Sequence, residues 1–459
     1  MQTVILAGGI GKRVFPLAVN KPKPMFKILG KPLIQYVIET VKEAGLKDFI
    51  IVTGHGFDQI ENYFGDGSSL GVDIRYTHQR KALGTANALE TAKDLVEDHF
   101  FVLNADDIFE TSLIESMAEL FKKTDAEIVL SCKPVKETWK WGIIKLEGGR
   151  VVRIVEKPER GMEPSNLAVI GAYIMTRKIF DYYERVPVSD HQYEDAIQKF
   201  IDDGNVVRAV KYDGFFSAYK YPWDLFRIND YLMDKHIRGQ VIEDGVAISR
   251  GAQIEGNVWI RRGTRVLEGA CIRGPCYIGS NTMIGNNSLI WNHSSIGDNC
   301  VIGFSTEVKN SLIGDNCWFH TSYVGDSIIS DNCSFGAGTV TANFRFDERS
   351  ISMMVNGRRV DTGRDKLGVI MAEDCKTGVN SCLLPGVRVG PRSIVGPGVC
   401  LYGDLEPNKM ILMSKGSYVK AENKTVISLA KRQELMRRLM KYKYGSSEGG
   451  GSTGTKPSS

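Results

Sequence analysis

A short repeated unit between residues 241 and 405 constrains the fold of this chain more than any other feature. A branched aliphatic residue followed by glycine recurs about every six residues, or at a multiple of six. We expect the aliphatic side chain to point into a narrow core and the glycine to form a corner. The spacing predicts stacked short strands, hence a parallel β-helix. Examples of the pair are Ile278-Gly279, Ile284-Gly285, Ile296-Gly297, Ile313-Gly314, Val389-Gly390 and Val395-Gly396.

Eight of the nine cysteines lie in this repetitive segment, between Cys271 and Cys400. No two form a Cys-x-x-Cys pair, and three follow Asp-Asn in one local frame, at Cys300, Cys317 and Cys333. A metal site or disulfides would use cysteines, but small buried apolar residues at equivalent places of a repeat explain the frame better. We therefore interpret these cysteines as core residues.

Residues 1–240 show a different pattern, in which apolar strands alternate with helices. This alternation predicts a parallel, doubly wound α/β sheet. Ligands of such sheets bind at the carboxyl ends of the strands. The expected strands are Gln2–Leu6, Phe49–Thr53 and Phe100–Leu103, and the expected helices begin at Pro32, ending at Gly45, and at Thr85.

The chain therefore divides into an α/β domain (1–240), a β-helix domain (241–420), a basic helix (421–444) and a flexible tail (445–459). The apolar side of the basic helix indicates packing on the β-helix or on a neighbouring subunit, with a membrane surface as the alternative. The tail is rich in glycine and serine, which is typical of a flexible linker.

The first predicted strand runs into a glycine-rich loop, LAGGIGKR. Gly8, Gly9 and Gly11 allow the backbone to approach a phosphate and to bind its oxygens through N–H groups. The loop matches neither the dinucleotide pattern GxGxxG nor a P-loop. Arg13 and Lys23 are placed to neutralise a triphosphate. The net charge of +4 suits an anionic phosphorylated substrate and is too small to indicate nucleic-acid binding.

Five segments together resemble the sugar-1-phosphate nucleotidyltransferases. They occur in the order of that family and cover nearly all of residues 1–235. The resemblance implies a Rossmann-like domain in which a sugar phosphate oxygen attacks the α-phosphorus of a nucleoside triphosphate and pyrophosphate leaves. The segments are LAGGIGKRVFPL with KPKPM, Gln79–Ala86, Leu103–Asp106, Glu156–Pro158 and Ser165–Gly171.

The resemblance also implies roles for single residues. Arg13 would hold the β- and γ-phosphates, Lys23 the α-phosphate and the sugar phosphate, and Asp106 a Mg²⁺ ion. The sugar would contact Glu156, Lys157 and Asn166. The nucleotide would contact Leu6, Ala7, Gly8, Gly9, Gly11, Gln79, Gly84 and Thr85.

One residue departs from this family's pattern. Ala218 stands where a second metal ligand, Asp or Asn, is usual, and alanine cannot bind a metal. Asp224 is close in sequence but fits a different position. Mg²⁺ can keep several waters and bind through one carboxylate plus phosphates.

The β-helix segment resembles the acetyltransferase half of the bifunctional N-acetylglucosamine-1-phosphate uridylyltransferases, most closely their archaeal branch. The motifs are His320–Asp326 (HTSYVGD), Gly336–Thr339, Ala342–Phe344, TGVNSCLLPGVRVG and a polar excursion from Arg345 to Lys366. The resemblance implies a left-handed β-helix and a homotrimer with coenzyme A sites between subunits. A spacer that only forms trimers is the alternative.

Acetyl transfer needs a base that takes a proton from a sugar amine, which then attacks the thioester of acetyl-CoA; histidine titrates in the right range. The resemblance makes His320 this base. It assigns Tyr323, Lys309 and Lys366 to the sugar phosphate, and Asn343 to the acetyl or pantetheine end. Two residues depart from the pattern: Trp291 stands where an arginine is frequent, and Ser334 where an asparagine is frequent.

We therefore expect a cytoplasmic, homotrimeric, bifunctional enzyme. It would acetylate glucosamine-1-phosphate with acetyl-CoA and transfer UMP from UTP, with Mg²⁺, to N-acetylglucosamine-1-phosphate. Because of Ala218 and Trp291, a second hypothesis is that only one of the two activities is retained. The enzyme would then use another substrate pair, such as glucose-1-phosphate with dTTP or UTP, or mannose-1-phosphate with GTP. A non-catalytic sugar-nucleotide sensor or scaffold is a third hypothesis. No signal peptide is evident, and no apolar run approaches the ~18 residues of a membrane helix.

Overall fold

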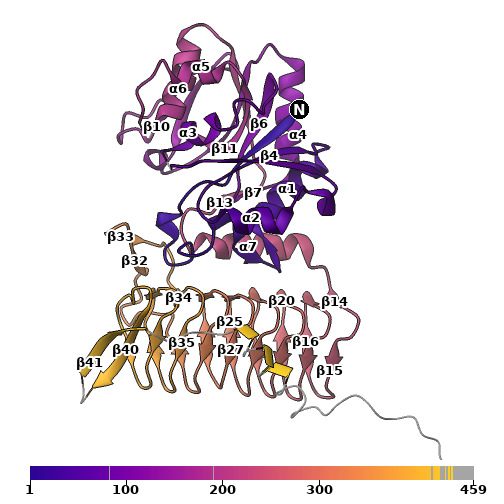
Figure 1. Cartoon of the computed structure of the whole chain (residues 1–459), viewed down its shortest axis with the longest axis vertical. Helices are drawn as coiled ribbons and strands as arrows, with labels where there is room; N and C mark the ends of the chain where they lie inside the picture. The colour runs from indigo at the N-terminus through magenta and orange to yellow at the C-terminus, as the bar shows by residue number, and fades with distance from the viewer. Residues whose placement is uncertain are drawn as a thin grey trace, which may run out of the picture.

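The structure is a computed structural model that describes residues 1–81, 83–189, 191–414, 417–423, 429–430, 433–434 and 436–437. It has an α/β part, strands β1–β13 with helices α1–α7, which stands on a β-helix part, strands β14–β41 (Figure 1). Most of the expected helix 421–444 and all of the tail 445–459 lie outside the described residues. Strand β41 (Ser417–Glu422) includes the first two residues of that expected helix, so a helix does not begin at 421. None of the described helices is long and apolar enough to cross a membrane.

A nine-stranded sheet forms the centre of the α/β part, in the order β5-β4-β1-β6-β11-β8-β12-β10-β9. The expected parallel arrangement is confirmed for its first four strands: β5 (Asp73–His78), β4 (Asp48–Thr53), β1 (Gln2–Leu6) and β6 (His99–Asn104). The rest of the sheet is mixed, because β11 runs antiparallel to both β6 and β8. These remaining strands are β11 (Leu167–Thr176), β8 (Ile128–Pro134), β12 (Val207–Lys211), β10 (Arg150–Glu156) and β9 (Gly142–Glu147).

Helices cover both faces of this sheet, as expected of a doubly wound fold. Neighbouring residues of a strand point to opposite faces, so Val4 and Ile5 of β1 belong to two different apolar cores. The core that contains Ile5 packs against α1 (Leu33–Glu43), α2 (Phe57–Phe64) and α4 (Thr111–Lys123). The core that contains Val4 packs against α3 (Thr85–Glu90), α5 (Ile179–Tyr183) and α6 (Gln192–Asp202).

The β-helix part stacks short strands into three sheets of eight, ten and eight strands, consistent with the left-handed coil of hexapeptide repeats. The strands of these sheets are parallel, except that β41 at the end of the second sheet runs antiparallel to β40 (Lys409–Ser414). The sheets begin at β14 (Gln240–Ile242), β15 (Ala247–Ile248) and β16 (Gln253–Glu255). They end at β37 (Arg388–Val389), β41 and β39 (Cys400–Leu401). The aliphatic residues of the repeat fill one continuous core, together with Cys300, Cys317, Cys333 and Cys375, which are fully buried free thiols. The interpretation of the framed cysteines as core residues is therefore confirmed.

The glycines of the repeat act differently from the expectation. Asn281, Asn299 and Asn316 take the left-handed conformation at the corners, with positive φ, which asparagine tolerates. Gly297 has no such φ; instead, a Cβ there would lie 2.7 Å from the carbonyl carbon of Gly314 in the next coil. The glycine that follows the aliphatic residue is needed because successive coils approach closely. The left-handed corner position is taken by asparagine in many coils and by glycine in others, as at Gly263, Gly269 and Gly338.

Helix α7 (Asp224–His236) links the two parts and lies along the β-helix (Figure 1). Its apolar residues share a core with Tyr277, Leu312 and Ile328 of the β-helix. A hairpin, β32 (Ser352–Val355) and β33 (Arg358–Asp361), rises from the β-helix part and joins the same core through Met353 and Val355. The two parts are therefore packed on each other through an apolar contact.

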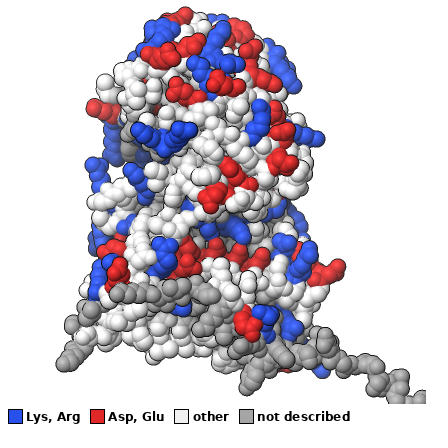
Figure 2. Space-filling view, viewed as in Figure 1, with Lys and Arg blue, Asp and Glu red and all other residues white. Residues whose placement is uncertain are grey.

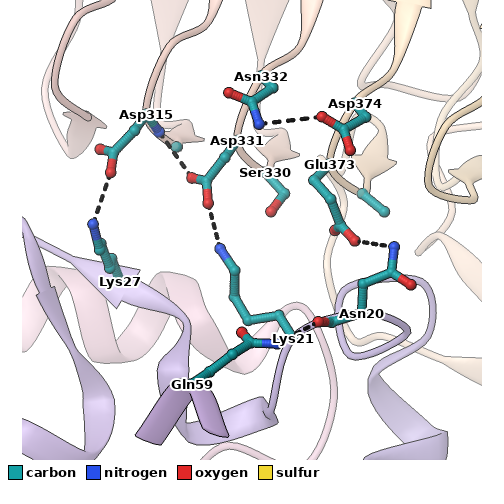
Figure 3. Close-up of polar contacts among 12 residues, drawn as sticks. Asn20, Lys21, Lys27, Gln59, Asp315, Ser330, Asp331, Asn332, Glu373 and Asp374 are labelled. Atoms are coloured by element: carbon teal, nitrogen blue, oxygen red, sulfur yellow. Dashed lines mark hydrogen bonds and ion pairs between the residues drawn. The ribbon is translucent and has the colours of Figure 1, made fainter. Parts of the chain in front are cut away.

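Charged groups surround this apolar contact. Figure 2 shows acidic and basic side chains gathered in a band where the two parts meet. In Figure 3, the segment 20–27 of the α/β part faces a row of acidic residues on successive coils. Lys21 forms an ion pair with Asp331, and Lys27 Nζ lies 2.7 Å from an oxygen of Asp315. Asn20 donates to Glu373 at 2.6 Å.

Candidate active sites

A cavity of about 680 Å³ opens at the carboxyl ends of β1 and β6. Its lining contains all eight residues expected to contact the nucleotide: Leu6, Ala7, Gly8, Gly9, Gly11, Gln79, Gly84 and Thr85. It also contains Arg13, Lys23, Asp106, Glu156 and Lys157. Asn166 is the expected residue that does not line this cavity; its side chain is exposed, and its role stays a prediction.

The glycine loop and the segment of Gln79 are built against each other. A Cβ at Gly8 would lie 2.6 Å from Oε1 of Gln79, so only glycine lets the two segments approach this closely. Nε2 of Gln79 donates to the backbone oxygen of Gly84 and to Oδ1 of Asn87, both at 3.1 Å. The two segments predicted to hold the nucleotide therefore form one wall of the cavity.

Lys23 and Asp106, expected at the phosphates and at the metal, form an ion pair with each other. Lys23 Nζ also lies 5.0 Å from the ring centre of Tyr219. The next residue, Asp107, is buried and accepts a hydrogen bond from Asn104 at 2.8 Å. Burial, with the neighbouring Asp106 carboxylate, raises the pKa of Asp107 to about 7.

Ala218 lies directly opposite Asp107, because β13 (Phe216–Ala218) pairs antiparallel with β7 (Asp107–Phe109). Two residues further on, Lys220 lines the cavity, with Nζ 3.2 Å from the ring centre of Trp141. Burial lowers the pKa of Lys220 to about 8. Asp224 cannot substitute for the missing ligand, because its Oδ2 accepts the backbone N–H groups of Lys220 and Tyr221 at 2.8 and 2.7 Å.

These residues do not fit the expected Mg²⁺ site. Asp106 is paired with Lys23, Ala218 offers no donor atom, and Lys220 adds a positive charge that repels a dication. Across the described ranges, no cluster of three or more His, Cys, Asp or Glu side chains could hold a metal ion. The sequence had already placed Ala218 at the ligand position; the contribution of Lys220 is visible only in the structure.

The lining of the cavity also holds the residues Glu156 and Lys157, which were expected at the sugar. Lys157 Nζ lies 3.0 Å from Oε1 of Glu156. A Cβ at Gly142 would lie 2.8 Å from the other oxygen of Glu156, so this glycine leaves room for the carboxylate. Glu194 of α6 also lines the cavity, and burial, followed by the charge of Glu156, raises its pKa to about 8. No motif in the sequence marks Glu194, because it lies far along the chain from the other lining residues.

The hairpin of the β-helix part also reaches this cavity. Asn356, at the turn between β32 and β33, is one of its lining residues. The turn is Asn356-Gly357, both with positive φ, and Arg358 and Arg359 beside it are exposed. The polar excursion from Arg345 to Lys366 begins and ends at the pairing of Phe344 with Lys366 on the β-helix, whereas its tip lines this cavity.

Residues expected to transfer the acetyl group gather on the outside of the β-helix around Asp326. The side-chain nitrogen of Asn343 donates to Oδ2 of Asp326 at 2.6 Å and to the hydroxyl of Tyr323 at 3.3 Å. Asn310 donates to the other oxygen of Asp326 at 2.6 Å. The structure thus brings Tyr323 and Asn343 together, next to the backbone pairing that holds Lys366. His320 is exposed at the preceding corner.

Trp291, which replaces an expected arginine, stands between two cations. Lys309 Nζ lies 5.9 Å from the ring centre of Trp291, and Cζ of Arg273 lies 5.1 Å from it. The indole N–H donates to Glu307 at 2.7 Å, which fixes the ring. The positive charge that the arginine would supply is therefore present on neighbouring coils, in Arg273 and Lys309.

Residues 2–234 match the family model described as Nucleotidyl transferase, and residues 275–310 match Bacterial transferase hexapeptide (six repeats). The chain is 34% identical over 419 residues to the "Bifunctional protein GlmU" of Methanocaldococcus jannaschii, covering 90% of this chain and 97% of that protein. It is 31% identical over 414 residues to the "Bifunctional sugar-1-phosphate nucleotidylyltransferase/acetyltransferase" of Sulfurisphaera tokodaii, covering 88% and 98%. A solved UDP-glucose pyrophosphorylase complexed with UDP-glucose is 27% identical, with 51% of this chain and 99% of that chain covered and a TM-score of 0.47.

Proposed function

Because this chain belongs to the family of bifunctional sugar-1-phosphate nucleotidyltransferase/acetyltransferases, we propose that it acetylates glucosamine-1-phosphate and then transfers UMP from UTP to the product. One observation carries the proposal. The cavity at the ends of β1 and β6 brings the glycine loop, Arg13, Lys23 and the sugar-side residue Glu156 to one place. UDP-N-acetylglucosamine and pyrophosphate are the products.

Nucleotidyl transfer at this cavity proceeds by in-line attack of a sugar phosphate oxygen on the α-phosphorus. Arg13 and Lys23 hold the two anions and screen the charge between them, so that positioning and electrostatics lower the barrier. Glu156 and Lys157 orient the sugar. No step is assigned to Mg²⁺, because Asp106 is paired and Ala218 supplies no second ligand.

Acetyl transfer takes place on the β-helix. His320 accepts the proton of the sugar ammonium, the free amine attacks the carbonyl carbon of acetyl-CoA, and the thiolate of coenzyme A leaves and is protonated. Tyr323, Lys309 and Lys366 hold the sugar phosphate, and Asn343 holds the acetyl end. The hydrogen bond between Asn343 and Tyr323 supports a shared site.

The acetyl-transfer site is completed in a homotrimer. Phe304 and Val379 are exposed at 59% and 50%, and backbone bonds place them on the same corner of the β-helix as His320, one coil before it and two coils after it. Apolar side chains along one corner suit contact with a second copy of the chain. The nine free cysteines support a reducing compartment, the cytoplasm.

A paired assay tests both activities on one sample. The chain is incubated with acetyl-CoA, UTP and glucosamine-1-phosphate, with and without Mg²⁺, and free coenzyme A and pyrophosphate are measured separately. We expect coenzyme A first and pyrophosphate second, and Lys23→Met should abolish only pyrophosphate. Coenzyme A alone, also with N-acetylglucosamine-1-phosphate and other triphosphates, would show that nucleotidyl transfer is lost. Neither product across a panel of sugar phosphates would refute the proposal.

A further inference from the structure

We infer that Lys220 binds the nucleotide phosphates in place of a divalent cation, so that this chain holds its nucleotide without a metal. The inference deepens the proposed nucleotidyl transfer and rests on it. The position is set by the fold: β13 pairs with β7, which puts Ala218 opposite Asp107, and the chain then turns so that Lys220 enters the cavity wall that Asp106 also lines. The usual carboxylate ligand is therefore missing at Ala218, and a positive charge, that of Lys220, is present two residues further on.

The ammonium group of Lys220 is held in place without being neutralised. Its Nζ lies 3.2 Å from the ring centre of Trp141, another lining residue, and the face of an indole ring attracts a cation. The backbone N–H of Lys220 donates to Asp224, which fixes the turn that carries it. In the described part of the chain, Lys220 forms no ion pair with a carboxylate, so its charge is available to a ligand.

The nearby carboxylates are occupied by other groups. Asp106 pairs with Lys23, and Glu156 pairs with Lys157. Asp107, the carboxyl group whose charge acts most on Lys220, accepts a hydrogen bond from Asn104, and Asp224 accepts two backbone N–H groups. A divalent cation here would displace Lys23 from Asp106 and lie close to two ammonium groups. A triphosphate, by contrast, is an anion, and it would offset the excess positive charge of Lys23, Lys220 and Arg13.

The chemistry of the group suits the task. A lysine ammonium is a compact point charge with three donors, and it forms charge-assisted hydrogen bonds with phosphate oxygens. Burial lowers the pKa of Lys220 only to about 8, so the group remains mainly charged at neutral pH, and a bound anion raises that pKa again.

Binding of UTP to the full chain, measured by calorimetry with either Mg²⁺ or EDTA, tests this inference. The unaltered chain should bind with dissociation constants that differ by less than about threefold between the two buffers. Lys220→Met should weaken binding in EDTA by roughly tenfold to a hundredfold, the loss expected of a hydrogen bond to a charged group. Lys122→Met, which removes one exposed positive charge on α4, is the matched control and should bind as the unaltered chain does.

Two further measurements separate the possible outcomes. An unchanged midpoint of urea unfolding of the α/β part, followed by tryptophan fluorescence, shows that Lys220→Met is folded there, and unchanged coenzyme A release shows that the β-helix is intact. The double variant Ala218→Asp/Lys220→Met should bind UTP only when Mg²⁺ is added, because it removes the lysine ammonium group and supplies a carboxylate that can bind the metal.

The inference is overturned if EDTA weakens UTP binding by the unaltered chain tenfold or more, or if Lys220→Met binds normally in EDTA. Failure of the unaltered chain to bind UTP in both buffers would instead contradict the proposed function itself, and the inference with it.

Discussion

The contact between Lys21 and Asp331 allows the attachment of the α/β part to the β-helix to be tested by a single substitution. Asp331→Asn removes the charge but keeps the size and one acceptor oxygen, so the backbone N–H of Asp315, now 2.9 Å from Asp331, can still be satisfied. Lys21 is then left with an ammonium group in a partly buried contact, without its charged partner. Glu373 is the remaining acid that acts on Lys21.

The size of the effect follows from the burial of the pair. Removing one partner of a buried ion pair costs about 3–5 kcal/mol, whereas an exposed pair contributes about 0–1 kcal/mol. The side chains of Lys21 and Asp331 are 18% and 24% exposed, between the two limits and closer to the buried one. We therefore expect Asp331→Asn to reduce the free energy of unfolding of the α/β part by about 2–3 kcal/mol.

Urea unfolding of the full chain, followed by tryptophan fluorescence, measures this loss. With a slope of about 2–3 kcal/mol/M, the midpoint of the α/β transition should fall by about 1 M. Asp298→Asn is the matched control: Asp298 stands two coils before Asp331 and accepts the backbone N–H of Ser280 at 2.7 Å. No direct ion pair with the α/β part involves Asp298 among the described residues, so its midpoint should change by less than about 0.3 M.

The reasoning also predicts that a second substitution restores part of the loss. Lys21→Met in the Asp331→Asn background removes the unpaired charge, so the double variant should be more stable than Asp331→Asn alone. Equal shifts for Asp331→Asn and Asp298→Asn would refute the argument. So would a double variant whose losses simply add.

Four further results are expected. The pKa of Asp331 is lowered from 3.8, chiefly because the charge of Lys21 acts against burial. The stabilisation by this pair is therefore complete above pH 3.8 and is lost as the pH falls below it. At that low pH, the unfolding midpoints of the unaltered chain and of Asp331→Asn should converge. Glu194, whose pKa is raised to about 8, is protonated at neutral pH and can donate a hydrogen bond to a sugar hydroxyl. The affinity for the sugar phosphate should therefore fall as the pH rises through 8. Glu194→Gln should remove this pH dependence. Replacing Ser352–Asp361 by a short Gly-Ser turn should raise the KM of nucleotidyl transfer several-fold, because Asn356 no longer lines the cavity, and leave the oligomeric state unchanged in light scattering. His320→Ala should lower coenzyme A release by roughly a hundredfold or more, with pyrophosphate release from N-acetylglucosamine-1-phosphate unchanged.

The hairpin β32–β33 and the segment 20–27 connect the two halves of the chain at the cavity beside β1 and β6. Segment 20–27 carries Lys23 into the cavity and is held at both ends by acidic residues of the β-helix, through Lys21 and Lys27. The excursion that carries the hairpin begins and ends at the pairing of Phe344 with Lys366, near the residues proposed for acetyl transfer, and its tip lines the same cavity. The proposed nucleotidyl site is therefore built from both halves, although its sequence motifs lie in the first.

The sequence by itself determined the features that depend on residues close together along the chain. The six-residue period is local, because each coil repeats the same contacts with its neighbours, so the β-helix and the burial of Cys300, Cys317 and Cys333 were predictable. The order of motifs along the first half was likewise sufficient to name thirteen residues that the cavity brings together. Ala218 could be singled out as a departure because it lies inside such a motif.

The tertiary structure alone decided what lies beside these residues. The mixed half of the sheet depends on the pairing of β11 with β6 and β8, which are distant in sequence. Glu194 and Asn356 reach the cavity from α6 and from the hairpin, and neither belongs to a local pattern. Lys220 became significant only when the structure placed it in the lining of the same cavity as Asp106, which is itself paired with Lys23. Charge and burial act between groups that are close in space, and distance along the chain does not record that closeness.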